Sequence, residues 1–230
     1  MPPSLTEISP HLHRARDTCN VYLLRHGADA ILIDFGAGAV LGVIPEGQPA
    51  PCAVVVTHHH RDQVQGLARA AAAGMQIWVP PVERELIETV DEHWQARPIA
   101  NTYDVRQDRF SLLEPVPVTG SVPEYRDLQL GSVRVRPVPT PGHTIGSVSY
   151  LAEVDGQRVA FVGDLLYAPG KVWSLAATMW SYGEHGGAAA TILSLLALKR
   201  ERLDVLLPSH GEPIRDVDAA IDRTVDELWR

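Results

Sequence analysis

AVVVTHHHRDQ, residues 53–63, joins a short apolar run to several side chains of the types that bind metal ions. The continuous apolar and β-branched residues at 53–56 predict a strand that is buried on both faces. Apolar residues then recur at helical spacing, and Gly74 stands where a helix commonly ends, which predicts a helix near 63–73. This stretch is therefore expected to be a strand-to-helix turn in an α/β protein.

The histidines of this turn alternate along the chain. Side chains of an extended segment point to opposite faces in turn, so we expect His58, His60 and Asp62 to lean to one side. His59 is expected to point the other way and to pack behind the site. Neutral imidazole and carboxylate groups are ligands that zinc and related ions favour. The turn therefore predicts part of a metal site.

Three later motifs each place a further candidate ligand beside a glycine. They are Pro141-Gly142-His143-Thr144, Gly163-Asp164 and Pro208-Ser209-His210-Gly211. Together with the first turn they supply four histidines and two aspartates, which is enough for two transition-metal ions. Two such ions can generate a hydroxide from bound water and polarise the bond under attack.

These ordered motifs resemble the signature of the metallo-β-lactamase superfamily, whose first motif reads H-x-H-x-D-H. The resemblance covers nearly the whole chain and implies a ligand set of six residues. The first ion would be held by His58, His60 and His143, and the second by Asp62 and His210, with Asp164 bridging the two.

One position departs from that signature. The residue after Asp62 is Gln63, where the superfamily usually has histidine. An amide oxygen can bind a metal ion, but it is a weaker donor to zinc than imidazole. The sequence therefore leaves open whether Gln63 is a ligand or a polar residue at the start of a helix. We expect two divalent ions, with zinc first and manganese or iron as alternatives, and a weaker second site.

The rest of the chain alternates strands and helices. Strands are predicted near 20–26, 30–35, 53–57, 76–79, 131–138, 146–152 and 158–163, and helices near 63–73, 82–94, 187–199 and 215–229. This pattern by itself gives only an α/β class, whereas the resemblance implies a four-layered αβ/βα sandwich. We expect one domain over 1–230, with a lid or insertion at 80–127.

The resemblance implies a metal-dependent hydrolase. A metal-bound hydroxide would cleave an ester, thioester, lactone, amide or phosphoester of a small molecule, and Asp62 would orient it or carry a proton. One alternative is a mononuclear iron oxygenase similar to the persulfide dioxygenases, which use positions equivalent to His58, His143 and Asp164. Another is a degenerate metal-binding module without catalysis.

Aromatic residues between the second and the fourth motif are candidates for binding substrate. The candidates between 164 and 187 are Tyr167, Trp173, Trp180, Tyr182 and His185. These side chains either line a pocket at the metals or fill the core.

Composition limits the partners. The chain has 230 residues, of which 45% are hydrophobic, and a formal net charge of −8, which argues against binding to nucleic acid. No apolar run approaches the ~20 residues of a membrane span. The polar start at 1–4 has no signal-peptide pattern, so we expect a cytoplasmic monomer or homodimer that acts on a small molecule.

Overall fold

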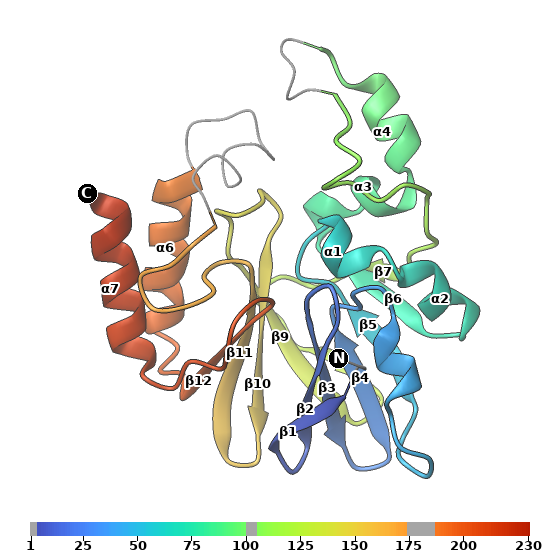
Figure 1. Cartoon of the computed structure of the whole chain (residues 1–230), viewed down its shortest axis with the longest axis horizontal. Helices are drawn as coiled ribbons and strands as arrows, with labels where there is room; N and C mark the ends of the chain where they lie inside the picture. The colour runs from blue at the N-terminus through green and yellow to red at the C-terminus, as the bar shows by residue number, and fades with distance from the viewer. Residues whose placement is uncertain (1–3, 100–104, 174–186) are drawn as a thin grey trace.

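The computed structural model describes residues 4–99, 105–173 and 187–230. Two β-sheets pack face to face, and helices cover the outer face of each sheet (Figure 1). This is the four-layered αβ/βα sandwich that the resemblance implied, so the predicted fold class is confirmed.

The first sheet is built from the N-terminal half of the chain. Its seven strands, in spatial order, are β1 (Leu5–Ser9), β2 (Leu12–Arg16), β3 (Asn20–His26), β4 (Asp29–Ile33), β5 (Pro51–Val55), β6 (Gln76–Val79) and β7 (Gly120–Ser121). Strands β1 to β4 pair antiparallel, and β4 to β7 pair parallel. The carboxyl ends of β4, β5 and β6 therefore meet at one edge of this sheet.

The second sheet comes from the C-terminal half. Its five strands, in spatial order, are β12 (Val205–Pro208), β11 (Gln157–Gly163), β10 (Val148–Val154), β9 (Val133–Pro139) and β8 (Leu128–Leu130). Strands β8 to β11 pair antiparallel, whereas β11 and β12 run parallel. The ends of β11 and β12 therefore lie together, one residue before Asp164 and two residues before His210.

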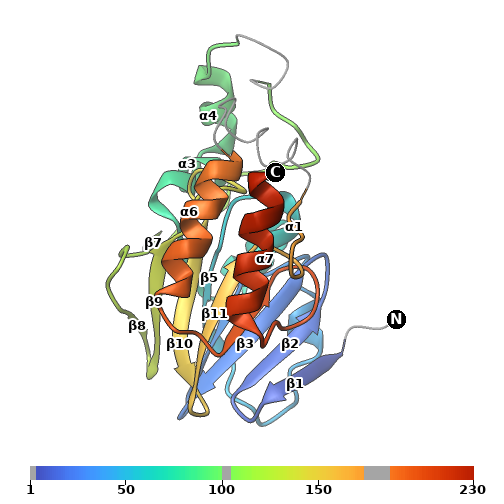
Figure 2. The same cartoon turned by 90° about the vertical axis from the view of Figure 1, so that its left-hand side faces the viewer.

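Two sets of helices complete the outer layers (Figure 1), and the turned view in Figure 2 looks onto the set that covers the second sheet. The first sheet carries η1 (Ala39–Gly42), α1 (Arg61–Val64), α2 (Leu67–Ala72), η2 (Pro81–Glu83), α3 (Glu85–Glu88) and α4 (Val90–Ala96). The second sheet carries α6 (Gly187–Lys199) and α7 (Val217–Trp229), which pack against one another.

Three apolar clusters follow from this layering. The central cluster fills the space between the sheets, where Tyr22 of β3 and Phe161 of β11 place their ring centroids 5.3 Å apart. A second cluster lies beneath the helices of the first sheet, and a third lies beneath α6 and α7. Because both faces of β5 contribute to these clusters, the apolar run at 53–56 is buried throughout, as predicted.

Two predicted helices are interrupted. The helix expected near 63–73 divides into α1 and α2 at Gly66, whose N–H donates to the carbonyl of Gly36 at 2.8 Å in place of a helix carbonyl. Gly66 also lies against Ala37, where an added Cβ would come within 2.6 Å of a backbone atom. The helix expected near 82–94 divides at Thr89, whose φ of −135° is not helical. The strands β1, β2, β7, β8 and β12 were not predicted.

The segment 80–127 contains η2, α3, α4 and β7 within its described part. In Figure 1, α4 stands above α3, beyond the edges of the sheets. The assignment of 1–230 to one domain with a lid or insertion at 80–127 stays a prediction.

Candidate metal centre

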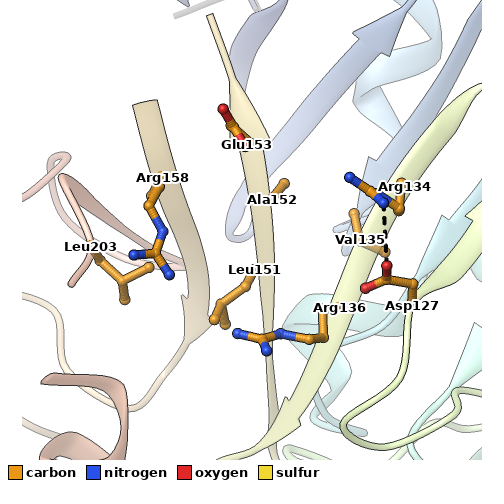
Figure 3. Close-up of a pocket in the computed structure, with 9 residues that line it drawn as sticks. All are labelled: Asp127, Arg134, Val135, Arg136, Leu151, Ala152, Glu153, Arg158 and Leu203. Carbon is orange, nitrogen blue, oxygen red and sulfur yellow. Dashed lines mark ion pairs between the residues drawn. The ribbon is translucent and has the colours of Figure 1, made fainter. Parts of the chain in front are cut away.

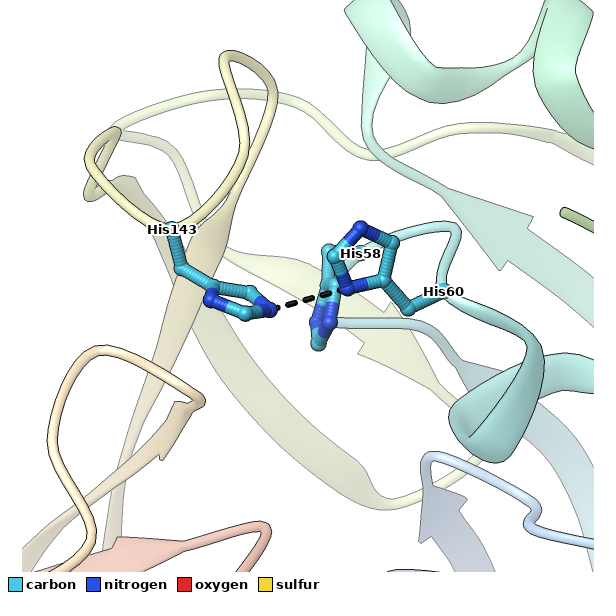
Figure 4. Close-up of side chains that lie close together, drawn as sticks. All are labelled: His58, His60 and His143. Carbon is cyan, nitrogen blue, oxygen red and sulfur yellow. Dashed lines mark hydrogen bonds between the residues drawn. The ribbon is translucent and has the colours of Figure 1, made fainter. Parts of the chain in front are cut away.

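His58, His60 and His143 form a compact group at the shared edge of the two sheets (Figure 4). One nitrogen from each residue lies within 4.8 Å of the others, and Nε2 of His143 lies 2.9 Å from Nδ1 of His60. The rings meet edge to face, with centroids 4.7–4.8 Å apart. The structure thus brings together the three histidines that the resemblance assigned to the first ion.

The protonation of these rings suits a cation. Burial lowers the pKa of His58 and of His143 well below the usual value, and neighbouring histidines add to the effect. Burial also lowers the pKa of His60 to about 3. All three imidazoles are therefore neutral near pH 7, which is the form that binds metal ions. Within the described structure, Nε2 of His58 is buried without a hydrogen-bond partner, so it is free to act as a ligand.

A second group joins Asp62, Asp164 and His210, again with ligand atoms within 4.8 Å of one another. Oδ2 of Asp62 lies 2.9 Å from Nε2 of His210. Oδ2 of Asp164 lies 3.7 Å from that nitrogen and 3.3 Å from Nε2 of His143. Asp164 is therefore the residue between the two groups, which is the position that a bridging ligand would take.

The electrostatics of this group also favour a cation. Burial raises the pKa of Asp164, and the negative charges of Asp62 and Asp34 raise it further, although His210 opposes the shift. Burial alone would lower the pKa of His210, but its hydrogen bond to the Asp62 carboxylate and the negative charge of Asp164 raise this pKa overall. A divalent ion would relieve the repulsion between the two carboxylates.

Gln63 lies fully buried in α1 and contacts both carboxylates of the second group. Its Nε2 donates to Oδ2 of Asp62 at 3.1 Å and to Oδ1 of Asp164 at 3.3 Å. Its Oε1 has no partner within the described structure. The extended chain on which the predicted alternation depends ends at His60, because Asp62 lies in the first turn of α1, and Asp62 nevertheless reaches the second ligand group.

The residue before His58 is hydrogen-bonded to a side chain at the end of β4. Asp34 follows that strand and accepts hydrogen bonds from the backbone N–H of Thr57, from its hydroxyl and from the hydroxyl of Ser209. Burial raises the pKa of Asp34 to about 7, although these hydrogen bonds oppose the shift. The carboxylate therefore links the loops that carry His58 and His210, a role the sequence analysis missed.

The loop of His210 is also held by polar side chains of the opposite sheet. Asn20 donates to the carbonyls of Pro208 and Gly211 at 3.0 Å and 2.9 Å. The hydroxyl of Tyr22 donates to the carbonyl of Pro208 at 2.7 Å. These contacts were not predicted, because their partners are 186–191 residues away along the chain.

His59 pairs with buried Glu83, and its ring centroid lies 4.9 Å from that of His60. Glu83 also contacts the chain after His143, through the hydroxyl of Thr144 and the N–H of Gly146. The sequence analysis missed Glu83. Because β5 and β6 are adjacent and parallel, residues that follow β6 lie close to residues that follow β5, which is the signal that could have found it.

The predicted substrate residues are only partly described. The Trp173 ring lies 5.1 Å from the His210 ring and 5.3 Å from that of Tyr167, and its side chain donates a hydrogen bond to Asp164. Trp180, Tyr182 and His185 lie outside the described residues. The Phe110 ring lies 5.5 Å from the His60 ring, a neighbour that was not predicted.

A cavity of about 290 Å³ lies beside the second group and is lined by Cys19, His210 and the chain around them. Another cavity of about 310 Å³ lies on strands β9 to β11, where Arg134 pairs with Asp127 at 3.4 Å (Figure 3). Its lining contains none of the six predicted ligands, so it is separate from the metal centre. Among the described residues, no helix is long and apolar enough to cross a membrane.

Two proteins with similar sequences align with most of this chain. A protein of Mycobacterium leprae named only as uncharacterized is 28% identical over 226 residues, covering 84% of this chain and 86% of that protein. The hydroxyacylglutathione hydrolase of Mesorhizobium japonicum is 29% identical over 147 residues, which is 64% of this chain and 46% of that enzyme.

Solved structures share the fold at low sequence identity. The metallo-beta-lactamase MIM-1 from Novosphingobium pentaromativorans has a TM-score of 0.73 and 18% identity, with 99% of this chain and 88% of that chain covered. A metallo-beta-lactamase from Cronobacter sakazakii, named for its HARLDQ motif, has a TM-score of 0.65 and 19% identity, with 98% and 93% covered. That motif ends in aspartate and glutamine, as residues 58–63 do here.

The family comparison agrees with the site and the fold. The model described as the metallo-beta-lactamase superfamily matches residues 14–210, which include all six predicted ligands. The chain therefore belongs to the metallo-beta-lactamase superfamily.

Proposed function

We propose that this protein is a metal-dependent hydrolase that cleaves an ester, thioester, lactone, amide or phosphoester bond of a small molecule. The observation that carries the proposal is the pairing of two adjacent ligand groups through Asp164, whose Oδ2 lies 3.3 Å from His143 and 3.7 Å from His210. When bound, divalent ions would supply an ionised water near neutral pH and positive charge for the oxygen of the bond under attack.

The two aspartates take different roles because their exposure differs. The Asp62 side chain is 39% exposed and hydrogen-bonded to His210, so it can hold an attacking water in place and accept a proton. The Asp164 side chain is only 4% exposed, so it has little access to bulk water and serves as a ligand. Neutral His58, His60 and His143 serve as the nitrogen ligands of the first ion.

The aromatic rings beside the centre provide surfaces for a substrate. Trp173 lies next to His210, and Phe110 lies next to His60, so an aromatic ring lies beside each of the two ligand groups. The relatives named hydroxyacylglutathione hydrolase put acylated glutathione first among the substrates to test, and the structural neighbours add β-lactams. Both classes contain an acyl carbon that a hydroxide can attack.

A second candidate is a mononuclear iron oxygenase that uses His58, His143 and Asp164. The observation in its favour is that the Gln63 amide donates to both carboxylates of the second group. Such bonds can hold Asp62 and Asp164 together without a second cation. Two histidines and one carboxylate are also the ligand set of many non-haem iron(II) oxygenases.

Elemental analysis of untagged protein purified without added metal separates these candidates. About two zinc or manganese ions per chain, together with hydrolysis of an ester, lactone or acyl-glutathione, would support the proposal. A single iron ion together with oxygen consumption on thiol persulfides would overturn it in favour of the oxygenase. Protein that binds neither metal after reconstitution would refute both.

A further inference from the structure

We propose that Glu83 is a positioning residue that sets the distance between the loop of His58 and His60 and the loop of His143. This inference rests on the proposed metal site, since those three histidines are its nitrogen ligands. Glu83 lies in η2, directly after β6, and is 1% exposed. It is not itself a candidate ligand.

Each carboxylate oxygen of Glu83 accepts hydrogen bonds from one of the two loops that carry the histidine ligands. Oε2 accepts the backbone N–H of His59 at 2.8 Å and pairs with Nδ1 of the same residue. Oε1 accepts the hydroxyl of Thr144 at 2.7 Å and the backbone N–H of Gly146 at 3.0 Å. His59 lies between two ligands, and Thr144 directly follows the third. The carboxylate therefore joins the two loops by four contacts.

The surroundings of Glu83 leave little freedom for either loop. A Cβ added to Gly146 would lie 2.5 Å from Cγ of Glu83, so the loop can approach this closely only with glycine. The hydroxyl of Thr144 is also bonded to that of Ser147 at 2.7 Å, which stiffens the same turn. Buried hydrogen bonds to a charged group are strong and directional. A change at Glu83 should therefore move the ligands relative to one another.

Glu83→Gln tests the role with little change in shape. Glutamine keeps one oxygen but replaces the other with an amide nitrogen, which would face an N–H donor of one loop. Outer contacts that orient metal ligands typically contribute about 10- to 100-fold in affinity. We therefore expect Zn²⁺ to bind the three-histidine site at least about 10-fold more weakly in this variant, measured by competition with a chromophoric chelator.

Asp155→Asn is the matched control. Asp155 joins β1 and the following turn to the β10–β11 turn by accepting from Ser9 at 2.6 Å and from the backbone N–H of His11 at 2.9 Å. These contacts do not involve the ligand loops, so the control should lower thermal stability and leave Zn²⁺ affinity unchanged. A loss of affinity in both variants would indicate a general effect of destabilisation and would overturn the inference.

The remaining outcomes are also decisive. Unchanged Zn²⁺ affinity in Glu83→Gln, with normal binding by the unaltered protein, would refute the positioning role alone. An unaltered protein that binds no metal would refute the proposed function, and the inference with it. If Glu83→Gln does not fold, Thr144→Val removes one contact on the His143 side and should weaken Zn²⁺ binding several-fold. Full affinity in Thr144→Val would then overturn the inference.

Discussion

Asp34 accepts two hydrogen bonds from Thr57, one from the backbone N–H at 2.7 Å and one from the hydroxyl at 2.9 Å. The same hydroxyl oxygen lies 3.0 Å from Nδ1 of His58. When Asp34 is ionised, the hydroxyl hydrogen is directed to the carboxylate, and the hydroxyl oxygen can then accept from Nδ1–H of His58. This arrangement selects the tautomer in which Nε2 of His58 carries a lone pair for a metal ion.

Thr57→Val should weaken metal binding, because it removes the hydroxyl that selects the His58 tautomer and leaves Nδ1 buried without a partner. We expect about a 10-fold rise in the Kd for the first Zn²⁺. Ser209→Ala is the control, since the Ser209 hydroxyl bonds Asp34 at 3.1 Å without contacting His58. Equal affinity in Thr57→Val and the unaltered protein would contradict the tautomer argument.

The raised pKa of Asp34 predicts a pH dependence of stability. Burial raises this pKa from 3.8 to about 7, so between those values the folded chain holds a proton that the unfolded chain has lost. Stability should therefore fall as pH rises from about 4 to about 7, by about 4 kcal/mol from this residue. Asp34→Asn removes this titration. In urea unfolding with a metal chelator present, the difference in free energy of unfolding between the two proteins should therefore change across that pH range. A difference independent of pH would refute the assignment.

His60→Ala and Asp164→Ala should each abolish turnover, because each removes a ligand from one of the two adjacent groups. Both variants are expected to keep the fold, as measured by circular dichroism. His26→Ala changes an exposed histidine at the end of β3 and serves as the control. A folded His60→Ala or Asp164→Ala protein that keeps most of its activity would defeat these ligand assignments.

Gln63→His should strengthen the second metal site. The substitution replaces an amide that donates to Asp62 and Asp164 with an imidazole that can bind an ion through a nitrogen lone pair. We expect a higher affinity for the second Zn²⁺, and little change for the first, by isothermal titration calorimetry. Unchanged stoichiometry and affinity would count against a position for Gln63 at the metals.

The strands and helices that were predicted well are those whose own residues determine them. The helix expected at 187–199 is α6, because a long apolar run follows two glycines and ends in basic residues. The strand expected at 76–79 is β6. The helix expected at 63–73 is broken, because the approach of Gly66 to Ala37 depends on a segment that is distant along the chain.

The sequence by itself determined which residues are candidate ligands, because imidazole and carboxylate groups at the ends of apolar runs form an ordered pattern. The tertiary structure brings these residues together as two adjacent groups with Asp164 close to both, an arrangement that the family resemblance implied but that no local spacing specifies. It also decided which partners hold the loops, since Asp34, Glu83 and Asn20 act across separations of 23 to 191 residues. Such contacts are made when strands pair and sheets pack, and no local sequence preference specifies them.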